Sequence, residues 1–227
     1  MWVKICGNTN LEDAALAAEL GADAVGFVFA TGKRQVTAAQ VGSITAHLPD
    51  GVERVGVFDS HDAEEIAAIA QEAGLTAVQL HGGLDEVLLE GLGKRLAGRV
   101  RVIQTLHWLV ADQAMENSSA QLAVQIEQVA RPGIADRLLI DSKVGAAGGG
   151  TGVAFDWAAA RELFASAPAA VHLIVAGGLT PENIARAIST LRPWGVDVSS
   201  RVETSPGRKD PARLAQFIAR ARAIETP

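Results

Sequence analysis

The segment VHLIVAGGLTPEN, residues 171–183, contains the unit from which the fold is predicted. Its first half, Val171 to Ala176, is a short run of apolar and β-branched residues that is typical of a buried strand. Gly177-Gly178 then interrupts the run, and Thr180 places a side-chain oxygen directly before Pro181, a pair that favours the first turn of a helix. The segment is therefore predicted to form a strand, a tight turn and the beginning of a helix.

The same succession of strand and helix recurs from one end of the chain to the other. Eight runs are predicted to be strands: Trp2 to Cys6, Ala24 to Phe29, Arg54 to Phe58, Ala77 to Leu80, Val100 to Thr105, Arg137 to Asp141, Val171 to Ala176 and Val196 to Val198. Because eight strand–helix units in 227 residues match the (β/α)₈ architecture, we predict a single-domain TIM barrel over residues 1–227. An open doubly wound sheet is the alternative, but the first strand–helix turn lacks its dinucleotide-binding glycine motif.

The helices between these strands are indicated by the spacing of apolar residues and by residues that favour helix starts and stops. The i, i+3, i+4, i+7 spacing predicts two of them from the sets Ile66, Ile69, Ala70, Ala73 and Leu214, Phe217, Ile218, Ala221. Gly21 and Gly74 are predicted helix stops, and Asp210-Pro211 a helix start. Between His107 and Arg131 only Leu122, Ile126 and Val129 indicate a helix. Ala146 to Gly152 lacks the Gly-Lys-Ser/Thr ending of a phosphate loop and is interpreted as a mobile loop.

Composition limits the setting and the ligand. The chain contains one cysteine and no signal-like N-terminus, which predicts a reducing, cytoplasmic environment. No apolar run approaches the roughly 18 residues of a membrane span. A net charge of −6 argues against nucleic-acid partners, which usually meet a basic face. The ligand is therefore expected to be a small molecule, and the chain to be a monomer or a homodimer.

The C-terminal ends of the predicted strands define the candidate site, because TIM-barrel active sites lie at that rim. The polar and glycine residues that fall there are Cys6, Arg34, His81, Asp141, Gly177, Gly178, Asp197, Ser199 and Ser200. Each also has a structural interpretation: a buried core thiol for Cys6, a turn cap for Asp141, a core-edge ring for His81 and a solvated charge for Arg34. Their gathering at one rim favours function.

Cys6 and Asp141 are predicted to face each other across the pocket. Period-two alternation places Trp2, Lys4 and Cys6 on the inward face of the first strand, while Val3 and Ile5 face the helices. A thiol near its ordinary pKa is partly ionised at neutral pH, and a desolvated carboxyl stays protonated, so the two form a base and an acid. Lys4 would lower the pKa of the thiol unless Asp197 neutralised its charge.

The glycines after the seventh strand and the serines after the eighth predict a phosphate site. Gly177 and Gly178 allow close backbone approach, and Ser199 and Ser200 precede a short helix whose amides would receive an anion. Isomerisation of a phosphorylated aldose to a ketose suits such a pocket, because proton transfers alone accomplish it without a cofactor or a metal.

Short segments in a fixed order carry a resemblance to a known family. They are VKICG at Val3, GFVF at Gly26, VGVF at Val55, VQLHG at Val78, LLID at Leu138, GGTG at Gly149, FDW at Phe155, AGGL.PEN at Ala176 and GVDVSS at Gly195. In this order the chain resembles phosphoribosylanthranilate isomerase of tryptophan biosynthesis. The resemblance implies a TIM barrel and a cofactor-free Amadori rearrangement of N-(5-phosphoribosyl)anthranilate.

The resemblance also implies residue roles. Asp141 would be the general acid that opens the ribose ring, and Cys6 the general base that removes the C2 proton. Arg34 would hold the anthranilate carboxylate with His81 beside it, Gly177, Gly178, Ser199 and Ser200 would bind the phosphate, and Asp197 would lie next to them.

Two positions depart from the family pattern. Gly32-Lys33-Arg34 replaces the usual Ser-x-Arg, and Arg201 stands where the family has glycine. Two rival functions stay open at this point. A histidine-pathway phosphosugar isomerase is expected to carry aspartate in place of Cys6, and a non-catalytic phosphometabolite-binding barrel would not require both Cys6 and Asp141.

Overall fold

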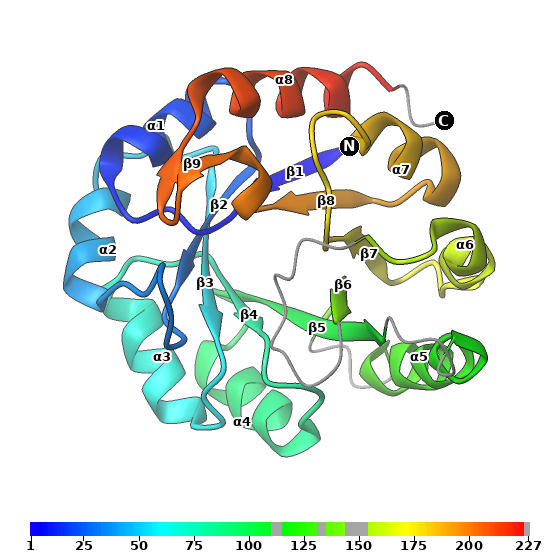
Figure 1. Ribbon diagram of the computed structural model, residues 1–227. Coiled ribbons are helices and arrows are strands. Elements are labelled where there is room, and N and C mark those ends of the chain that lie inside the picture. The colour runs from blue at the N-terminus through cyan, green and yellow to red at the C-terminus, as the bar shows by residue number, and fades with distance from the viewer. Residues whose placement is uncertain (110–114, 131–134, 144–153, 225–227) are drawn as a thin grey trace.

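The computed structural model describes residues 1–109, 115–130, 135–143 and 154–224. Within them, eight parallel strands close into a barrel in chain order, and eight helices surround it (Figure 1). The strands are β1 (Trp2–Ile5), β2 (Ala24–Val28), β3 (Glu53–Phe58), β4 (Ala77–Leu80), β5 (Arg101–Leu109), β6 (Arg137–Lys143), β7 (His172–Val175) and β8 (Gly195–Val198). The predicted TIM barrel is confirmed.

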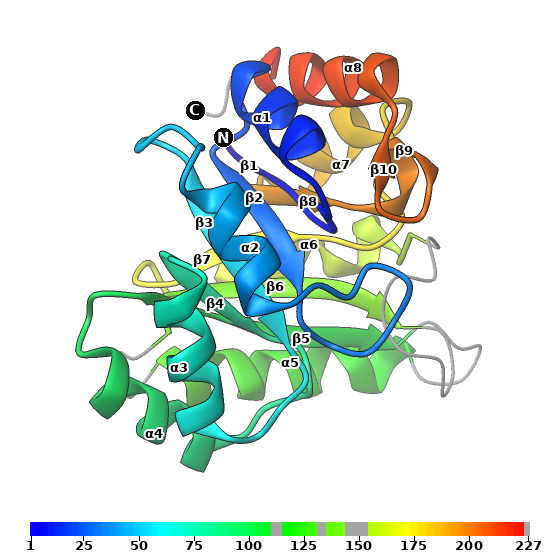
Figure 2. The ribbon, with the colours of Figure 1, turned by 90° about the vertical axis from the view of Figure 1, so that its left-hand side faces the viewer.

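The helices form an outer ring, which Figure 2 shows from the side. They are α1 (Leu11–Glu19), α2 (Ala38–Thr45), α3 (Ala63–Glu72), α4 (Glu86–Leu96), α5 (Met115–Ala130), α6 (Trp157–Ser166), α7 (Ile184–Leu191) and α8 (Pro211–Arg222). Asp210 caps α8 by accepting from the backbone amides of Ala212 and Arg213, with Pro211 at the first turn as predicted. Gly21 and Gly74 follow α1 and α3 with positive φ, so both predicted stops are confirmed.

The alternation of β1 separates two apolar cores. Val3 and Ile5 belong to the large core between strands and helices, whereas Trp2 belongs to a smaller core inside the barrel. Lys4, on the same face as Trp2, is fully buried above that inner core. The barrel interior is therefore apolar toward the N-terminal ends of the strands and polar toward their C-terminal ends.

An arginine closes the N-terminal end of the barrel. The Arg137 guanidinium lies 5.3 Å from the ring centroid of Trp2 and 4.8 Å from that of Trp194. Its Nη1 and Nη2 donate to the two carboxylate oxygens of Glu53 at 2.5 and 3.0 Å. This cluster pairs the charge of a nearly buried arginine and stabilises the end opposite the predicted site.

Some predicted element ends need correction, and one predicted loop falls outside the described residues. β5 runs to Leu109 and β6 to Lys143, beyond their predicted ends at Thr105 and Asp141, because the two strands stay paired through Leu109 opposite Lys143. α7 begins at Ile184, and the amides of Glu182 and Asn183 instead approach the Thr180 hydroxyl in a preceding turn. The loop predicted at 146–152 lies outside the described residues.

The poorly marked stretch after His107 contains both a strand end and a helix. His107 to Leu109 complete β5, and α5 follows from Met115. Leu122, Ile126 and Val129 are all buried in the large core, which confirms the helix predicted from them. Among the described residues, no helix combines the length and apolar character needed to cross a membrane.

A small hairpin between β8 and α8 was not predicted. It begins with the 3₁₀ turn η1 (Ser200–Val202) and continues as β9 (Glu203–Ser205) and β10 (Arg208–Lys209), with Gly207 at positive φ between the strands. In Figures 1 and 2 this hairpin lies beside the segment that joins β1 to α1. The Thr9 hydroxyl donates to the Gly207 carbonyl at 2.7 Å, which fastens the hairpin there.

Candidate active site

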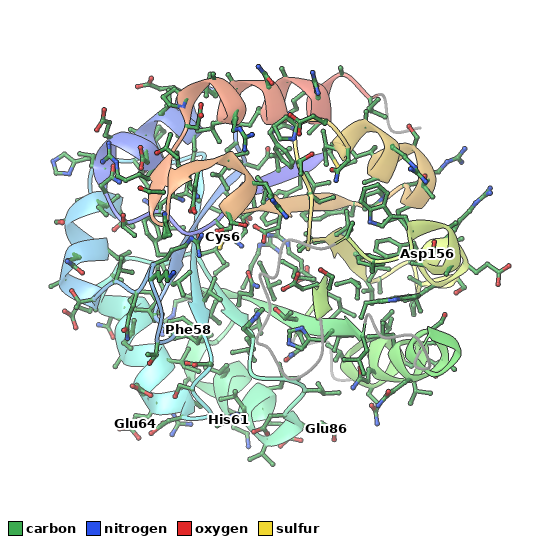
Figure 3. The ribbon with its side chains drawn as sticks, in the orientation of Figure 1. Cys6, Phe58, His61, Glu64, Glu86 and Asp156 are labelled. Atoms are coloured by element: carbon green, nitrogen blue, oxygen red, sulfur yellow. The ribbon has the colours of Figure 1, made fainter. Side chains whose placement is uncertain are left out.

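One cavity of about 430 Å³ opens at the C-terminal ends of the strands, within the size range of small-molecule sites. Every residue predicted for the site lines it: Cys6, Arg34, His81, Asp141, Gly177, Gly178, Asp197, Ser199 and Ser200. Figure 3 shows Cys6 toward the middle of the ring of strands, whereas His61, Glu64 and Glu86 lie at the periphery. The fold thus brings together residues from both ends of the chain.

Cys6 and Asp141 enter the cavity from opposite parts of the barrel. Cys6 directly follows β1 and Asp141 lies within β6, three places away around the ring through β8 and β7. Cys6 is 8% exposed and Asp141 is 6% exposed. Both side chains are therefore largely shielded from water while they line the same cavity, an arrangement that suits proton transfer on two sides of one substrate.

The thiol of Cys6 lies among several charges. Burial raises its pKa above the ordinary value, and the Asp197 carboxylate adds to the rise, while the ammonium groups of Lys4 and Lys209 oppose it. Lys4 Nζ donates to Asp197 Oδ1 at 2.8 Å. The expectation of a thiol near its ordinary pKa is therefore corrected, because burial raises the pKa of Cys6 even though Lys4 lowers it more than Asp197 raises it.

Gly26 on β2 leaves room for this thiol. A Cβ atom at Gly26 would lie 2.8 Å from Cys6 Sγ and 3.0 Å from Lys4 Cε. Cβ atoms essentially never approach other atoms so closely. Only a glycine at position 26 therefore leaves room for the Cys6 sulfur at its observed position. Sequence reasoning did not assign Gly26 this function, although it belongs to the GFVF segment.

His81 contributes a neutral ring. Its pKa is lowered to about 4, first by burial and then by the charge of His107, whose ring packs edge-on at a centroid distance of 5.0 Å. Among the described residues, its buried Nδ1 has no hydrogen-bond partner. An uncharged imidazole suits contact with an uncharged, aromatic part of a ligand.

Gly177 and Gly178 form a turn that no other residue type adopts easily. Their φ angles are +80° and +65°. A Cβ at Gly177 would also lie 2.8 Å from Asp141 Oδ1 and would overlap the Ser142 hydroxyl. The turn after β7 therefore packs directly against the carboxylate on β6, with Ser199 and Ser200 across the cavity wall on the segment after β8.

Arg34 is anchored before any ligand arrives. Its Nε donates to both carboxylate oxygens of Glu203 at 2.9 and 3.1 Å, and its Nη2 donates to Oε2 at 2.6 Å. Nη1 of the same guanidinium carries two further N–H donors. The predicted site residue thus has a fixed partner that the sequence analysis missed.

Glu203 and Lys209 are the principal functional candidates that sequence reasoning missed. Both come from the hairpin after β8, and their side chains are 3% and 0% exposed. The Pro206-Gly207 dipeptide is a turn signal that could have indicated the hairpin. No local signal indicates that Lys209 reaches Cys6, because 203 residues separate them.

Comparisons with known proteins agree with this geometry. Residues 3–220 match the family model described as N-(5'phosphoribosyl)anthranilate (PRA) isomerase. The N-(5'-phosphoribosyl)anthranilate isomerase of Thermotoga neapolitana is 40% identical over 226 residues, covering 98% of each chain.

Two solved structures are similar over nearly the whole chain. One is a phosphoribosyl anthranilate isomerase in complex with reduced 1-(o-carboxyphenylamino)-1-deoxyribulose 5-phosphate, with a TM-score of 0.79, 35% identity and coverage of 99% of this chain and 100% of that one. The other is a generated monomer of the dimeric isomerase from Thermotoga maritima, with a TM-score of 0.77, 36% identity and the same coverage.

Proposed function

The chain belongs to the N-(5'-phosphoribosyl)anthranilate isomerase family, and from that membership we propose how its residues carry out the reaction. The chain is an isomerase of tryptophan biosynthesis. It converts N-(5-phosphoribosyl)anthranilate into 1-(2-carboxyphenylamino)-1-deoxyribulose 5-phosphate, an Amadori rearrangement in which hydrogen moves and no atom is gained or lost.

Asp141 acts first, as the general acid. Its carboxyl protonates the ribose ring oxygen, the bond from that oxygen to C1 breaks, and the nitrogen lone pair forms a protonated Schiff base at C1. Asp141 lies on β6 between β5 and β7 and lines the same cavity as Cys6, which supports this role.

Cys6 acts second, as the general base. Its thiolate removes the proton from C2, and the electrons of that C–H bond form the C1–C2 double bond of an enolamine, which tautomerises to the C2 ketone. Burial raises the thiol pKa, so most of the thiol is protonated at neutral pH. The desolvated thiolate is a correspondingly stronger base, and Lys4 and Lys209 lower the free energy needed to form it.

The remaining lining residues hold the substrate. Arg34 binds the anthranilate carboxylate through the donors that Glu203 does not use, and the neutral ring of His81 lies beside the aromatic group. Gly177, Gly178, Ser199 and Ser200 bind the phosphate, and Asp197 contacts the substrate next to them. All of these residues line one cavity of suitable size, which supports a single bound orientation.

The setting of the enzyme follows from the same reasoning. We propose that residues 1–227 form one barrel domain that works in the cytoplasm on a small phosphoribosyl substrate, as a monomer or a homodimer. The barrel strands span Trp2 to Val198 and α8 packs on the same core, which supports the single domain.

The observation that carries the proposed roles is the shared cavity of Cys6 and Asp141 on opposite parts of the barrel. The direct test is a turnover assay of the purified chain with N-(5-phosphoribosyl)anthranilate, together with complementation of a tryptophan auxotroph that lacks this isomerase. We expect growth and turnover with the intact chain and neither with the Cys6→Ser, Asp141→Asn double variant. A double variant as active as the intact chain would refute the assigned roles.

A further inference from the structure

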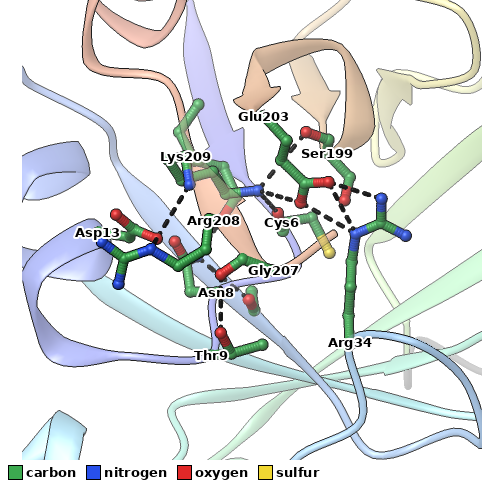
Figure 4. A network of polar contacts seen from close by, with 12 residues as sticks. Cys6, Asn8, Thr9, Asp13, Arg34, Ser199, Glu203, Gly207, Arg208 and Lys209 are labelled. Carbon is green, nitrogen blue, oxygen red and sulfur yellow. Dashed lines mark hydrogen bonds and ion pairs between the residues drawn. The ribbon is translucent and has the colours of Figure 1, made fainter. Parts of the chain in front are cut away.

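The hairpin formed by β9 and β10 connects two parts of the active site that come from different strands. Lys209 Nζ donates to the backbone carbonyl of Cys6 at 2.5 Å and to Glu203 Oε1 at 2.9 Å. Glu203 in turn accepts three hydrogen bonds from Arg34. Figure 4 shows this continuous network from Cys6 through Lys209 and Glu203 to Arg34.

We propose that Lys209 and Glu203 are positioning residues, Lys209 fixing the peptide carbonyl of the base Cys6 and Glu203 fixing the guanidinium of Arg34. One two-stranded hairpin would then set the placement of both groups. This inference rests on the proposed functions of Cys6 and Arg34. Neither Lys209 nor Glu203 lines the cavity, so they act through the residues they hold.

The backbone at Cys6 explains why its carbonyl needs a hydrogen-bond partner. The amide of Cys6 is paired with the Val198 carbonyl at 2.8 Å, but β1 ends at Ile5 and Gly7 follows with φ of +76°. The carbonyl of Cys6 thus belongs to a peptide unit at a strand end next to a flexible residue. The Lys209 ammonium donates to this carbonyl, and without that bond the peptide unit that follows Cys6 would have more conformational freedom.

The hairpin is itself held in place from a third direction. The backbone amide of Lys209 donates to Asp13 Oδ2 at 2.9 Å, and the Thr9 hydroxyl donates to the Gly207 carbonyl. Asp13 lies in the first turn of α1, the helix that follows the segment containing Cys6. The hairpin and the β1–α1 segment therefore form one assembly in which the Lys209 side chain has little freedom.

The charges of the network are balanced inside the protein. Burial lowers the pKa of Lys209, while Glu203 opposes that effect. Burial would raise the pKa of Glu203, but the hydrogen bond from Arg34 and the charge of Lys209 outweigh it and the pKa is lowered. Removing one charge alone would leave the other groups less well paired, so a single variant can also lose stability.

The test uses variants that separate positioning from stability. Lys209→Met keeps the buried aliphatic stem and removes the ammonium group, and the Lys209→Met, Glu203→Gln double variant removes both charges together. Arg208→Met is the matched control, because Arg208 neighbours Lys209 on β10 but its side chain is 51% exposed and its ion pairs are with Glu12 at 3.1 Å and, more distantly, with Asp13 at 3.8 Å. Melting temperature shows whether each variant folds.

Two readouts report on the groups that Lys209 and Glu203 contact. The first is the separation of kcat from KM with N-(5-phosphoribosyl)anthranilate. The second is the pH dependence of alkylation by iodoacetamide, which reports on Cys6 alone because the chain has one cysteine. The groups that act on this thiol are Lys4 from β1, Asp197 from β8 and Lys209 from β10, with Arg34 and Glu203 behind them.

We expect Lys209→Met to lower kcat by about tenfold or more with less than about threefold change in KM. Its alkylation profile should move to higher pH, because a cation that favours the thiolate is lost. Glu203→Gln should mainly raise KM, since Arg34 loses its carboxylate partner. Arg208→Met should match the intact chain in all three measurements.

The proposal is overturned if a folded Lys209→Met variant, or the folded double variant when the single one does not fold, retains both the kcat and the alkylation profile of Arg208→Met. Failure of the underlying assignment would look different. An active Cys6→Ser variant would remove Cys6 as the base, while the alkylation profiles would still show whether Lys209 acts on that thiol.

Discussion

Lys4 Nζ lies 2.8 Å from Asp197 Oδ1, and the two residues are direct neighbours in the pairing of β1 with β8. The side chain of Lys4 is fully buried, whereas that of Asp197 is 12% exposed and reaches the cavity. Burial would lower the pKa of Lys4, but the charges of Asp197 and Cys6 outweigh it and the pKa is raised. Lys4 therefore keeps its charge throughout the pH range in which the enzyme works.

Lys4→Met should change the pH profile and the stability together. Because the thiol pKa is raised, kcat/KM should increase with pH above neutrality until the thiolate predominates. Losing the Lys4 charge raises that pKa further, so the rising limb should move to higher pH. The free energy of unfolding should fall by roughly 3 kcal/mol, since Asp197 loses its partner. Urea unfolding measures the stability, and kcat/KM measured over a pH series gives the profile, with Lys94→Met as the exposed control. If the rise of kcat/KM with pH did not move in Lys4→Met, the role of Lys4 would be purely structural.

Cys6→Ser should lower turnover by roughly 10² to 10⁴, because a hydroxyl is far harder to ionise than a thiol and supplies almost no anionic base near neutral pH. The substitution changes little volume, so binding of reduced 1-(o-carboxyphenylamino)-1-deoxyribulose 5-phosphate and the melting temperature should stay close to those of the intact chain. Steady-state kinetics and calorimetric titration provide the comparison. Near-normal turnover would make the thiol a core residue.

Asp141→Asn should abolish most of the turnover while preserving the fold, since the amide keeps the shape of the carboxyl but cannot donate the required proton. The expected loss in kcat is again roughly 10² to 10⁴, with the product analogue still bound. The measurement is single-turnover kinetics together with analogue binding. If the variant stayed active, the acid would have to be another residue of the cavity.

Gly26→Ala should impair catalysis by crowding the thiol. The added methyl group would lie 2.8 Å from Cys6 Sγ and 3.1 Å from Cys6 Cα, so the side chain of Cys6 must shift. We expect kcat to fall by at least about tenfold, equivalent to about 1.4 kcal/mol, and stability to fall by about 1 to 3 kcal/mol. Gly51→Ala is the control, because a Cβ there meets nothing within 4 Å. Equal kinetics for the two variants would contradict the assigned position of the sulfur.

Arg201→Gly should change kcat/KM by less than about tenfold. The backbone at this position does not require the glycine usual in the family, because Arg201 lies in the 3₁₀ turn η1 and is not among the described residues with positive φ. Its backbone amide is retained whichever residue is present, so a phosphate contact through the backbone would persist. If the intact chain were inactive and the Arg201→Gly variant were active, the arginine would be shown to block the phosphate site.

The sequence was sufficient for the barrel and for the set of residues at its rim. Strand and helix periodicities are local properties, and parallel closure then places every strand end at one rim, which is how Cys6 and Asp141 were predicted to share a cavity. The predicted ends of β5 and β6 were wrong because each strand is extended by pairing with the other. His107 pairs with Asp141, and the pairing continues to Leu109 and Lys143.

The partners of the site residues could not be predicted in the same way. Arg34 was assigned from its position after the second strand, but its bond to Glu203 joins residues 169 positions apart. A two-residue strand such as β10 has no periodicity to detect, so the placement of Lys209 required the folded structure. Residue types at the rim were predictable, whereas the contacts behind the rim were not.

The hairpin of β9 and β10 bears on whether the site residues could be transferred to another protein scaffold. Cys6 directly follows β1 and Asp141 lies on β6, positions that many barrels could supply, yet the carbonyl of Cys6 accepts from Lys209, which lies 203 residues away in the sequence. If Cys6 and Asp141 are the base and the acid, as we propose, a graft of these two side chains onto another scaffold would lack the lysine that holds the backbone of Cys6. A transferred site would therefore need segments that are far apart in the sequence, and these would include the hairpin between β8 and α8.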